Sequence, residues 1–181
     1  MSRLVLLFIA IALGQALGQA APGDRPPNII FLFADDQRAD TIAAHGNPHI
    51  RTPNLDRMAG RGFSFRRNYC AGSFSGAVCV ASRAMLMTGR HWMNLPANRP
   101  ATNWGGATVL PTLLAKRGGY EPFIIGKWHN GKGMLDRSFA NGRSVYMGGM
   151  ANHAYFAVQD LKDGELGKER DAGGFSSTVF A

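Results

Sequence analysis

The stretch Asn28-Ile-Ile-Phe-Leu-Phe-Ala34 decides the fold class of this 181-residue chain. Its apolar residues run on without the alternation expected of a strand with one wet face, so it predicts a parallel strand buried on both faces. The run stops abruptly at Asp35-Asp36. Open α/β sheets bind ligands at the carboxyl ends of their strands, so we expect this acidic pair to lie where a site would form.

Helix and strand patterns alternate downstream of the acidic pair. The expected elements are a helix that begins at Thr52-Pro53 and ends near Gly62, a strand over Phe63–Tyr69, a helix over Cys79–Met87, a helix over Thr108–Arg117 and a strand over Tyr120–Ile125. This order predicts an α/β fold with a mostly parallel central sheet flanked by helices.

The pattern weakens after Gly131. Tyr146–Ala157 has no clear period, and the charge-rich stretch Asp160–Asp171 predicts a solvated loop. Phe175–Ala181 reads as the beginning of a helix.

The composition narrows the class of partner. The chain has 45% hydrophobic residues, a formal net charge of +8 and a pI near 10.1. A basic balance is compatible with nucleic acid, a membrane surface or an anionic substrate. The sequence has no long basic run, no zinc-finger spacing and no Walker loop, so we expect no nucleic-acid partner.

The first residues predict export. Arg3 precedes the apolar run Leu4–Leu13, and small residues suited to cleavage follow. The run is shorter than the ~20 residues that a membrane-spanning helix needs. We therefore interpret residues 1–20 as a signal peptide and residues 21–27 as a linker. The protein is expected to be periplasmic or extracellular, with no stable membrane insertion after cleavage.

Two pairs of polar residues follow predicted strands. Asp35-Asp36 offers hard oxygen ligands for calcium or magnesium, or forms a polar turn that caps the next helix. Lys127 and His129 alternate at the end of another strand, so their side chains can point the same way. Lysine can hold an anionic oxygen and histidine can move a proton near neutral pH. The alternative is an ordinary surface loop.

Cys79 and Arg83 are four residues apart, so a helix would place them on one face. A guanidinium beside a nucleophile at a helix start favours bound oxyanions. The alternative is structural, because two cysteines in an exported protein often pair. A Cys70–Cys79 disulfide would close a short loop and remove the nucleophile.

These segments together resemble the sulfatase family, which belongs to the alkaline phosphatase superfamily. The similarity covers roughly Asn28–Gly131, with the apolar strand into the acidic pair followed by TPNLDRMAGRGFSFRRNYC, GAVCVASRAMLMTGR and GKWHNG. The most specific signal is Cys-x-x-Ser-Arg with a following Thr-Gly-Arg. It is more specific still in combination with Gly-Lys-Trp-His. The resemblance implies an alkaline-phosphatase-like α/β fold.

The resemblance also implies a mechanism. A formylglycine-generating maturation enzyme would oxidise Cys79 to formylglycine, and a hydroxyl of the hydrated aldehyde would attack the sulfur of a sulfate ester. Asp35-Asp36 would hold a calcium ion that also contacts the nucleophile at position 79. Arg83 would fix the formylglycine, Lys127 would stabilise charge on the sulfate, and His129 would assist the elimination step.

Two departures from the family qualify this expectation. The maturation pattern usually has Pro two residues after the Cys, whereas this chain has Ala81. Sulfatases are also much longer and carry a later Asp-Asn pair, which is absent from this sequence. We therefore interpret residues 28–181 as the N-terminal part of a sulfatase catalytic domain.

Two alternative functions stay open from the sequence. One is hydrolysis of phosphodiesters or phosphonate esters by a member of the same superfamily. The other is a non-catalytic secreted module that binds metal or glycans. The expected substrate is a sulfated small molecule or a sulfated glycan.

Overall fold

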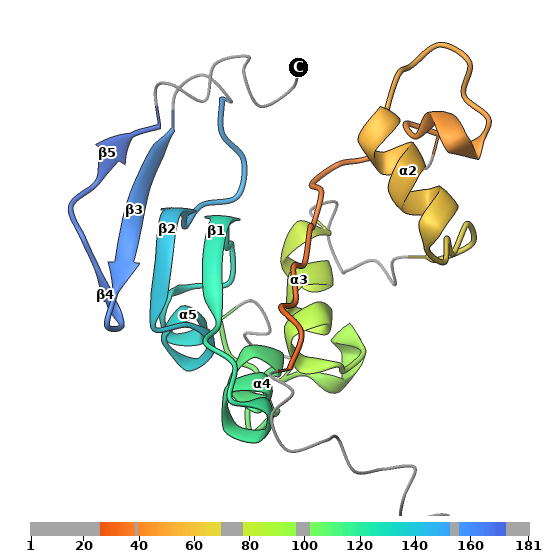
Figure 1. Ribbon diagram of the computed structural model, residues 1–181. Coiled ribbons are helices and arrows are strands. Elements are labelled where there is room, and N and C mark those ends of the chain that lie inside the picture. Colours follow the sequence, from red (N-terminus) through yellow and green to blue (C-terminus); the bar gives the residue numbers. More distant parts are fainter. Residues whose placement is uncertain (1–25, 39, 70–77, 97–101, 153–155, 173–181) are drawn as a thin grey trace, which may run out of the picture. The chain divides into compact units, whose positions relative to one another are not determined.

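The computed structural model describes residues 26–38, 40–69, 78–96, 102–152 and 156–172. The chain divides into two compact units, Met1–Phe33 and Ala34–Ala181. All helices and strands assigned to the described residues lie in the second unit (Figure 1).

The helical elements are η1 (Ala43–His45), α2 (Pro53–Arg61), α3 (Cys79–Thr88), η2 (Trp92–Asn94), α4 (Leu110–Gly118) and α5 (Lys132–Ser138). The strands are β1 (Phe123–Lys127), β2 (Asn141–Tyr146), β3 (Ala157–Lys162), β4 (Glu165–Leu166) and β5 (Arg170–Asp171). Helix α5 connects β1 to β2 and forms a β-α-β unit with them.

The sheet has the order β1-β2-β3-β4, and β5 also pairs with β3. Strands β1 and β2 are parallel, whereas β2–β3, β3–β4 and β3–β5 are antiparallel. The α/β fold class is confirmed. Among the described residues, parallel pairing is limited to β1 and β2 of the β-α-β unit. The end of β1 holds Lys127, one of the predicted site residues.

The three predicted helices form close to their expected bounds. Pro53 begins α2, where the missing N–H of proline costs nothing. Helix α3 ends at Gly89, whose φ of 63° is left-handed and whose N–H donates to the Met85 carbonyl at 2.8 Å. Helix α4 ends in the same manner at Gly119, with φ 65°.

The strand predicted over Asn28–Ala34 is wrong, because these residues are assigned no strand. Ile30 and Leu32 are 83% and 71% exposed. A strand buried on both faces needs a hydrogen-bonded neighbour at each edge and a layer on each face. The described residues of this segment have no ladder partner.

The strand predicted over Phe63–Tyr69 is also wrong. This segment lies against η1 as a loop, because the Ser64 hydroxyl is 2.7 Å from His45 Nε2 and the Arg66 guanidinium donates to the His45 carbonyl at 2.8 Å. Phe63, Phe65 and Tyr69 are exposed. The aromatic residues favour a strand, but these polar contacts hold the backbone as a loop.

The solvated loop predicted over Asp160–Asp171 is wrong as well, since this stretch contains the second half of β3 and all of β4 and β5. Asp163 and Gly164 have φ of 51° and 84°, as a two-residue hairpin turn requires. The Asp160 carboxylate accepts from the Ser144 N–H at 2.8 Å and from Arg170 Nη2 at 2.9 Å. Asp160 and Arg170 thus pair across β3 and β5, which the sequence pattern did not reveal.

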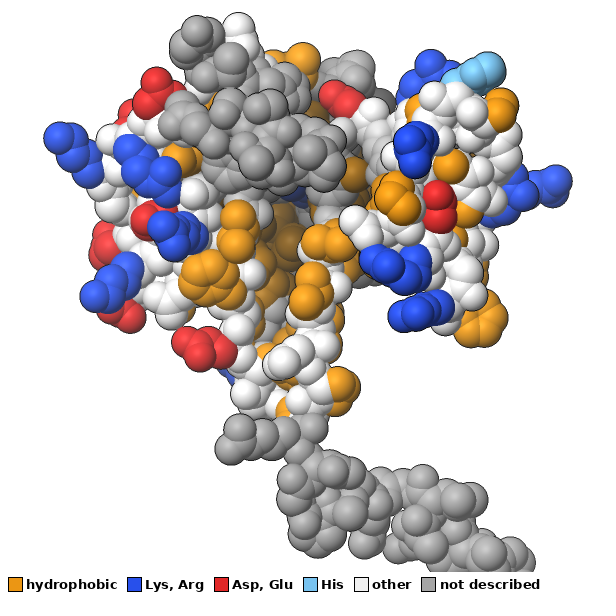
Figure 2. Space-filling view, turned by 45° about the horizontal axis from the view of Figure 1, so that its top comes forward, with side chains coloured by type: hydrophobic (Ala, Val, Ile, Leu, Met, Phe, Trp, Pro, Cys, Tyr) orange, Lys and Arg blue, Asp and Glu red, His pale blue; other side chains and the backbone are white. Residues whose placement is uncertain are grey.

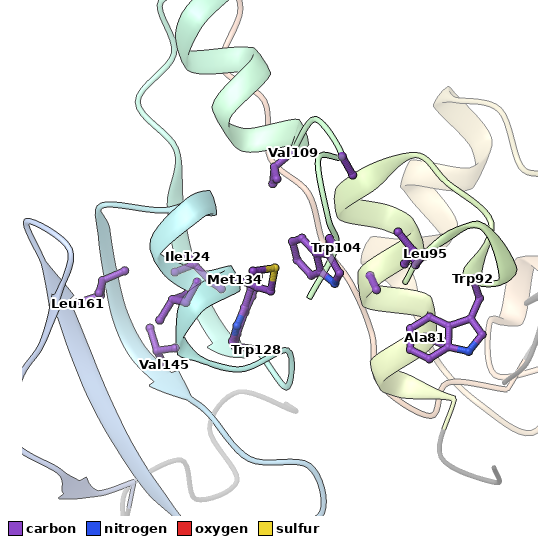
Figure 3. Close-up of a cluster of buried hydrophobic side chains, with 13 residues drawn as sticks. Ala81, Trp92, Leu95, Trp104, Val109, Ile124, Trp128, Met134, Val145 and Leu161 are labelled. Carbon is purple, nitrogen blue, oxygen red and sulfur yellow. The ribbon is translucent and has the colours of Figure 1, made fainter. Parts of the chain in front are cut away.

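One core connects the β-α-β unit to α3 (Figure 3). Trp104 lies at its centre, with Trp128 and Met134 on one side and Ala81 and Leu95 on the other. The Trp104 and Trp128 ring centroids are 5.8 Å apart. Large buried aromatic rings dominate the energetics of such a core. Trp128 therefore anchors the segment that follows β1.

The visible face of the molecule carries scattered basic side chains among acidic and apolar ones, with no continuous basic stripe (Figure 2). No helix among the described residues is long and apolar enough to span a bilayer. The predicted signal peptide, most of the 21–27 linker and the helix start expected at Phe175–Ala181 lie outside the described residues.

Candidate active site

Asp35 is the point at which the predicted site residues converge. Its Oδ2 atom accepts from Lys127 Nζ at 2.5 Å and lies 3.7 Å from Arg83 Nη2. The Asp35 side chain is 36% exposed, whereas those of Arg83 and Lys127 are 10% and 15% exposed. One carboxylate therefore neutralises two cations that are largely removed from water.

Asp36 follows with a φ of 57°. Aspartate is one of the few non-glycine residues that enter this left-handed region readily. Asp35 contacts the two cations, and the backbone turns at the next residue, Asp36. Two adjacent carboxylates with different backbone conformations offer oxygen ligands from one short turn.

Cys79 is the first residue of α3, is partly exposed and forms no disulfide within the described part of the chain. Its partner in the alternative disulfide, Cys70, lies outside the described residues. No side chain caps α3, and its first turn contains no acidic residue. The unpaired N–H groups of a helix start favour a negative charge at this end.

Arg83 is buried one turn after Cys79, as the four-residue spacing predicted. Its Nη1 atom donates to the Lys127 carbonyl at 2.6 Å, which joins α3 to the end of β1. Burial lowers the pKa of the Arg83 guanidinium, and the nearby Asp35 and Cys79 raise it. Because arginine stays protonated in proteins, Arg83 is a fixed positive charge beside the thiol.

Lys127 ends β1 and His129 follows two residues later, on either side of the buried Trp128. Burial lowers the pKa of His129, and the cations Lys127 and Arg83 lower it further, against an opposing effect of Asp35. His129 Nδ1 is buried and has no hydrogen-bond partner among the described residues. The imidazole is therefore neutral at neutral pH and able to take up a proton.

Asn130 is a site residue that the sequence reasoning missed. It is fully buried, and its Nδ2 atom donates to the Val80 carbonyl at 3.2 Å. This bond and the bond from Arg83 to the Lys127 carbonyl are two ties between the 127–130 segment and the first turns of α3. Its position within GKWHNG was visible, but an amide has no charge to mark it as functional.

The acidic pair fits part of a calcium site. Carboxylate oxygens are the ligands that a hard cation prefers, and Ca²⁺ takes six to eight oxygens. Among the described residues, no group of three or more His, Cys, Asp or Glu side chains could hold a metal. Asp35 and Asp36 therefore match the donor chemistry of calcium and supply only some of the ligands.

Comparison with known proteins identifies one family. The profile described as Sulfatase matches residues 27–170. N-acetylgalactosamine-6-sulfatase of Canis lupus familiaris is 40% identical over 147 residues, which cover 71% of this chain and 26% of that protein. Human arylsulfatase A is 36% identical over 135 residues, which cover 70% and 24%.

A bacterial relative gives the same result. N-acetylglucosamine-6-O-sulfatase of Bacteroides thetaiotaomicron is 34% identical over 130 residues, covering 71% of this chain and 22% of that protein. No solved structure matches the chain significantly. The chain thus spans about a quarter of the length of these relatives.

Proposed function

This chain belongs to the sulfatase family, and we propose that the protein hydrolyses sulfate esters through a formylglycine formed from Cys79. The observation that carries the proposal is the convergence of Asp35, Arg83 and Lys127, two charged ion-pair contacts on one carboxylate. These residues come from three separate sequence motifs. A purely structural cysteine would not require this charged surrounding.

Cys79 has the placement that this chemistry needs. It is partly exposed at the start of α3 and forms no disulfide with another described residue. A maturation enzyme can reach such a residue, whereas a buried or disulfide-bonded cysteine would be protected. When hydrated, formylglycine would supply a hydroxyl whose oxygen attacks the sulfur of the ester, while the bond between sulfur and the alcohol oxygen breaks and the alcohol leaves.

Arg83 and Lys127 provide the positive charge for the reaction. Both are largely buried, so their charges are weakly screened and their attraction for a sulfate group is strong. Arg83 is held by the Lys127 carbonyl and so orients residue 79 from a fixed position. Lys127 would shift between the Asp35 carboxylate and an oxygen of the bound sulfate.

His129 would accept and return the proton. Its lowered pKa keeps the imidazole neutral before substrate arrives. A neutral imidazole can take a proton from a hydroxyl at position 79 and so assist the step that expels sulfate. Burial and the neighbouring cations thus leave the His129 imidazole neutral at neutral pH, where it can act as a base.

Calcium would be held by Asp35 and Asp36, whose oxygens suit a hard cation. Bound there, it would supply positive charge beside the nucleophile and a sulfate oxygen. The described residues offer too few ligands for the complete site. The chain spans about a quarter of the length of its sulfatase relatives, so we propose that further ligands come from outside the described residues.

The names of the relatives indicate only a broad substrate class. The names of the relatives include sulfatases of two amino sugars and an arylsulfatase. We propose a sulfated glycan or sulfated small molecule, met after export through the signal peptide at residues 1–20. Reaction with the formylglycine-generating enzyme would precede activity.

The test is hydrolysis of an aryl sulfate and of the matching aryl phosphate by the protein, coexpressed with the maturation enzyme. We expect sulfate release that disappears in Cys79→Ala. Val78→Ala, next to the nucleophile, is the control and should retain turnover. Faster hydrolysis of the phosphate ester, or equal activity of Cys79→Ala, would contradict the proposal.

A further inference from the structure

The backbone of His129 is held in an unusual conformation. Its φ of 62° is in the left-handed region, which is uncommon for a residue with a β-carbon. The residues on either side, Trp128 and Asn130, are fully buried, and the Trp128 N–H donates to the Tyr146 carbonyl at 2.8 Å. Such conformations persist only when the surroundings enforce them, and they concentrate at functional sites.

The imidazole of His129 rests on Gly149, which follows β2. A β-carbon added at Gly149 would clash with Nε2 of His129 and would lie 2.6 Å from Cε1 and 3.3 Å from Cδ2. These are three of the five ring atoms. The ring therefore occupies the space that any side chain at position 149 would need.

Gly149 is not explained by its own backbone. Its φ lies outside the left-handed region, unlike that of Gly126 or Gly131. The φ of Gly149 is thus open to residues other than glycine. Glycine is required at this position because the imidazole ring of His129 fills the space of a side chain. The segment is itself held in place, because the Tyr146 hydroxyl donates to the Met150 carbonyl at 3.0 Å.

We propose that Gly149 is a positioning residue for His129, because the space left by its missing side chain fixes the orientation of the imidazole. The proposal rests on the proposed function of His129 as the proton carrier. The Nδ1 atom of the same ring is buried and has no hydrogen-bond partner among the described residues. A methyl group at position 149 rotates or displaces the ring.

The first test measures the ring directly, without turnover. The Cε1–H and Cδ2–H NMR signals of His129 are identified among the five histidines by their loss in His129→Gln. Gly149→Ala should shift both signals. Gly133→Ala, in α5 and with open space around the added β-carbon, should leave them in place. Unchanged signals in Gly149→Ala would overturn the proposal.

The second test uses a double-mutant cycle in thermal stability, which remains informative if Gly149→Ala is poorly folded. Overpacking against the ring should lower the Tm by about 2–8 °C. In a His129→Ala background the clash is absent, so Gly149→Ala should cost almost nothing. An equal loss in both backgrounds would assign Gly149 a role independent of His129 and overturn the proposal.

The third test links position to reaction. In Gly149→Ala, kcat should fall by about 10–100-fold with KM little changed, because a misplacement of about 1 Å can cost this much. Gly133→Ala should keep the activity of the parent protein. A rise in KM with kcat unchanged would contradict positioning of a proton carrier. If the protein lacked sulfatase activity, the proposed function would fail while the first two tests would still decide the role of Gly149.

Discussion

Lys127 and Asp35 form an ion pair, with Nζ 2.5 Å from Oδ2, although 92 residues separate them in the chain. The pair joins the acidic turn after the apolar run to the end of β1. Arg83 of α3 completes the group at 3.7 Å from the same oxygen. Three elements of the site are thus connected through one carboxylate.

Breaking this pair should weaken the fold. Lys127→Met leaves Asp35 with its more distant partner only, and we expect the free energy of unfolding to fall by about 1–2 kcal/mol, reduced by the partial exposure of the carboxylate. Urea denaturation measures the change. Lys132→Met breaks the exposed pair with Asp136 and should cause no measurable loss. Equal effects of the two substitutions would show that the Lys127–Asp35 pair stabilises the fold no more than an exposed ion pair does.

Asn130 should be sensitive to a change of one atom. Asn130→Asp removes the donor to the Val80 carbonyl and places a carboxylate in a fully buried position, which should cost about 2–4 kcal/mol at neutral pH. Burial would raise the pKa of the introduced carboxylate, so the loss should shrink as pH falls. Asn94→Asp, at an exposed position, is the matched control. Denaturation at several pH values tests both parts.

A constant penalty across the acidic range would contradict the buried placement of residue 130. A large loss in Asn94→Asp would mean that added negative charge, rather than position, causes the effect.

The pH dependence of stability should report on His129. Its pKa in the folded protein is lowered from 6.5, so the unfolded chain binds more protons between the two values. The free energy of unfolding thus decreases as the pH falls from 6.5 toward the lowered pKa, because the unfolded chain takes up the proton first. His129→Gln should remove this part of the pH dependence. Melting curves from about pH 7.5 to about pH 5 measure it, and parallel profiles of the two proteins would contradict the prediction.

The sequence predicted the helices well because they depend on local signals. Proline at the start of α2, the left-handed Gly89 and the Cys79–Arg83 spacing each act within a few residues. The strands were harder, since pairing partners determine whether Phe63–Tyr69 becomes a strand or a loop. Asp163-Gly164 was a hairpin signal that the surrounding charges obscured. Asn130 and Gly149 became visible only through their distant neighbours Val80 and His129.

Ala81 should limit the maturation of Cys79. It is the fully buried third residue of α3, where the family pattern has proline. Ala81→Pro should raise the converted fraction and lower the Tm slightly, because proline disfavours the helical conformation of Val80 and overfills the site. Ala81→Val adds bulk without the proline ring and should lower the Tm without raising conversion. Peptide mass spectrometry and melting curves separate the two effects, and equal conversion in all three proteins would contradict the prediction.

The account depends most on the chemical state of residue 79. The deciding measurement is mass spectrometry of the peptide that contains this residue, from protein coexpressed with the formylglycine-generating enzyme. We predict the mass of an aldehyde in place of the thiol. In Arg83→Ala this mass should disappear, because Arg83 holds the segment that contains residue 79. An unmodified thiol, or a disulfide between Cys79 and Cys70, would contradict the central claim.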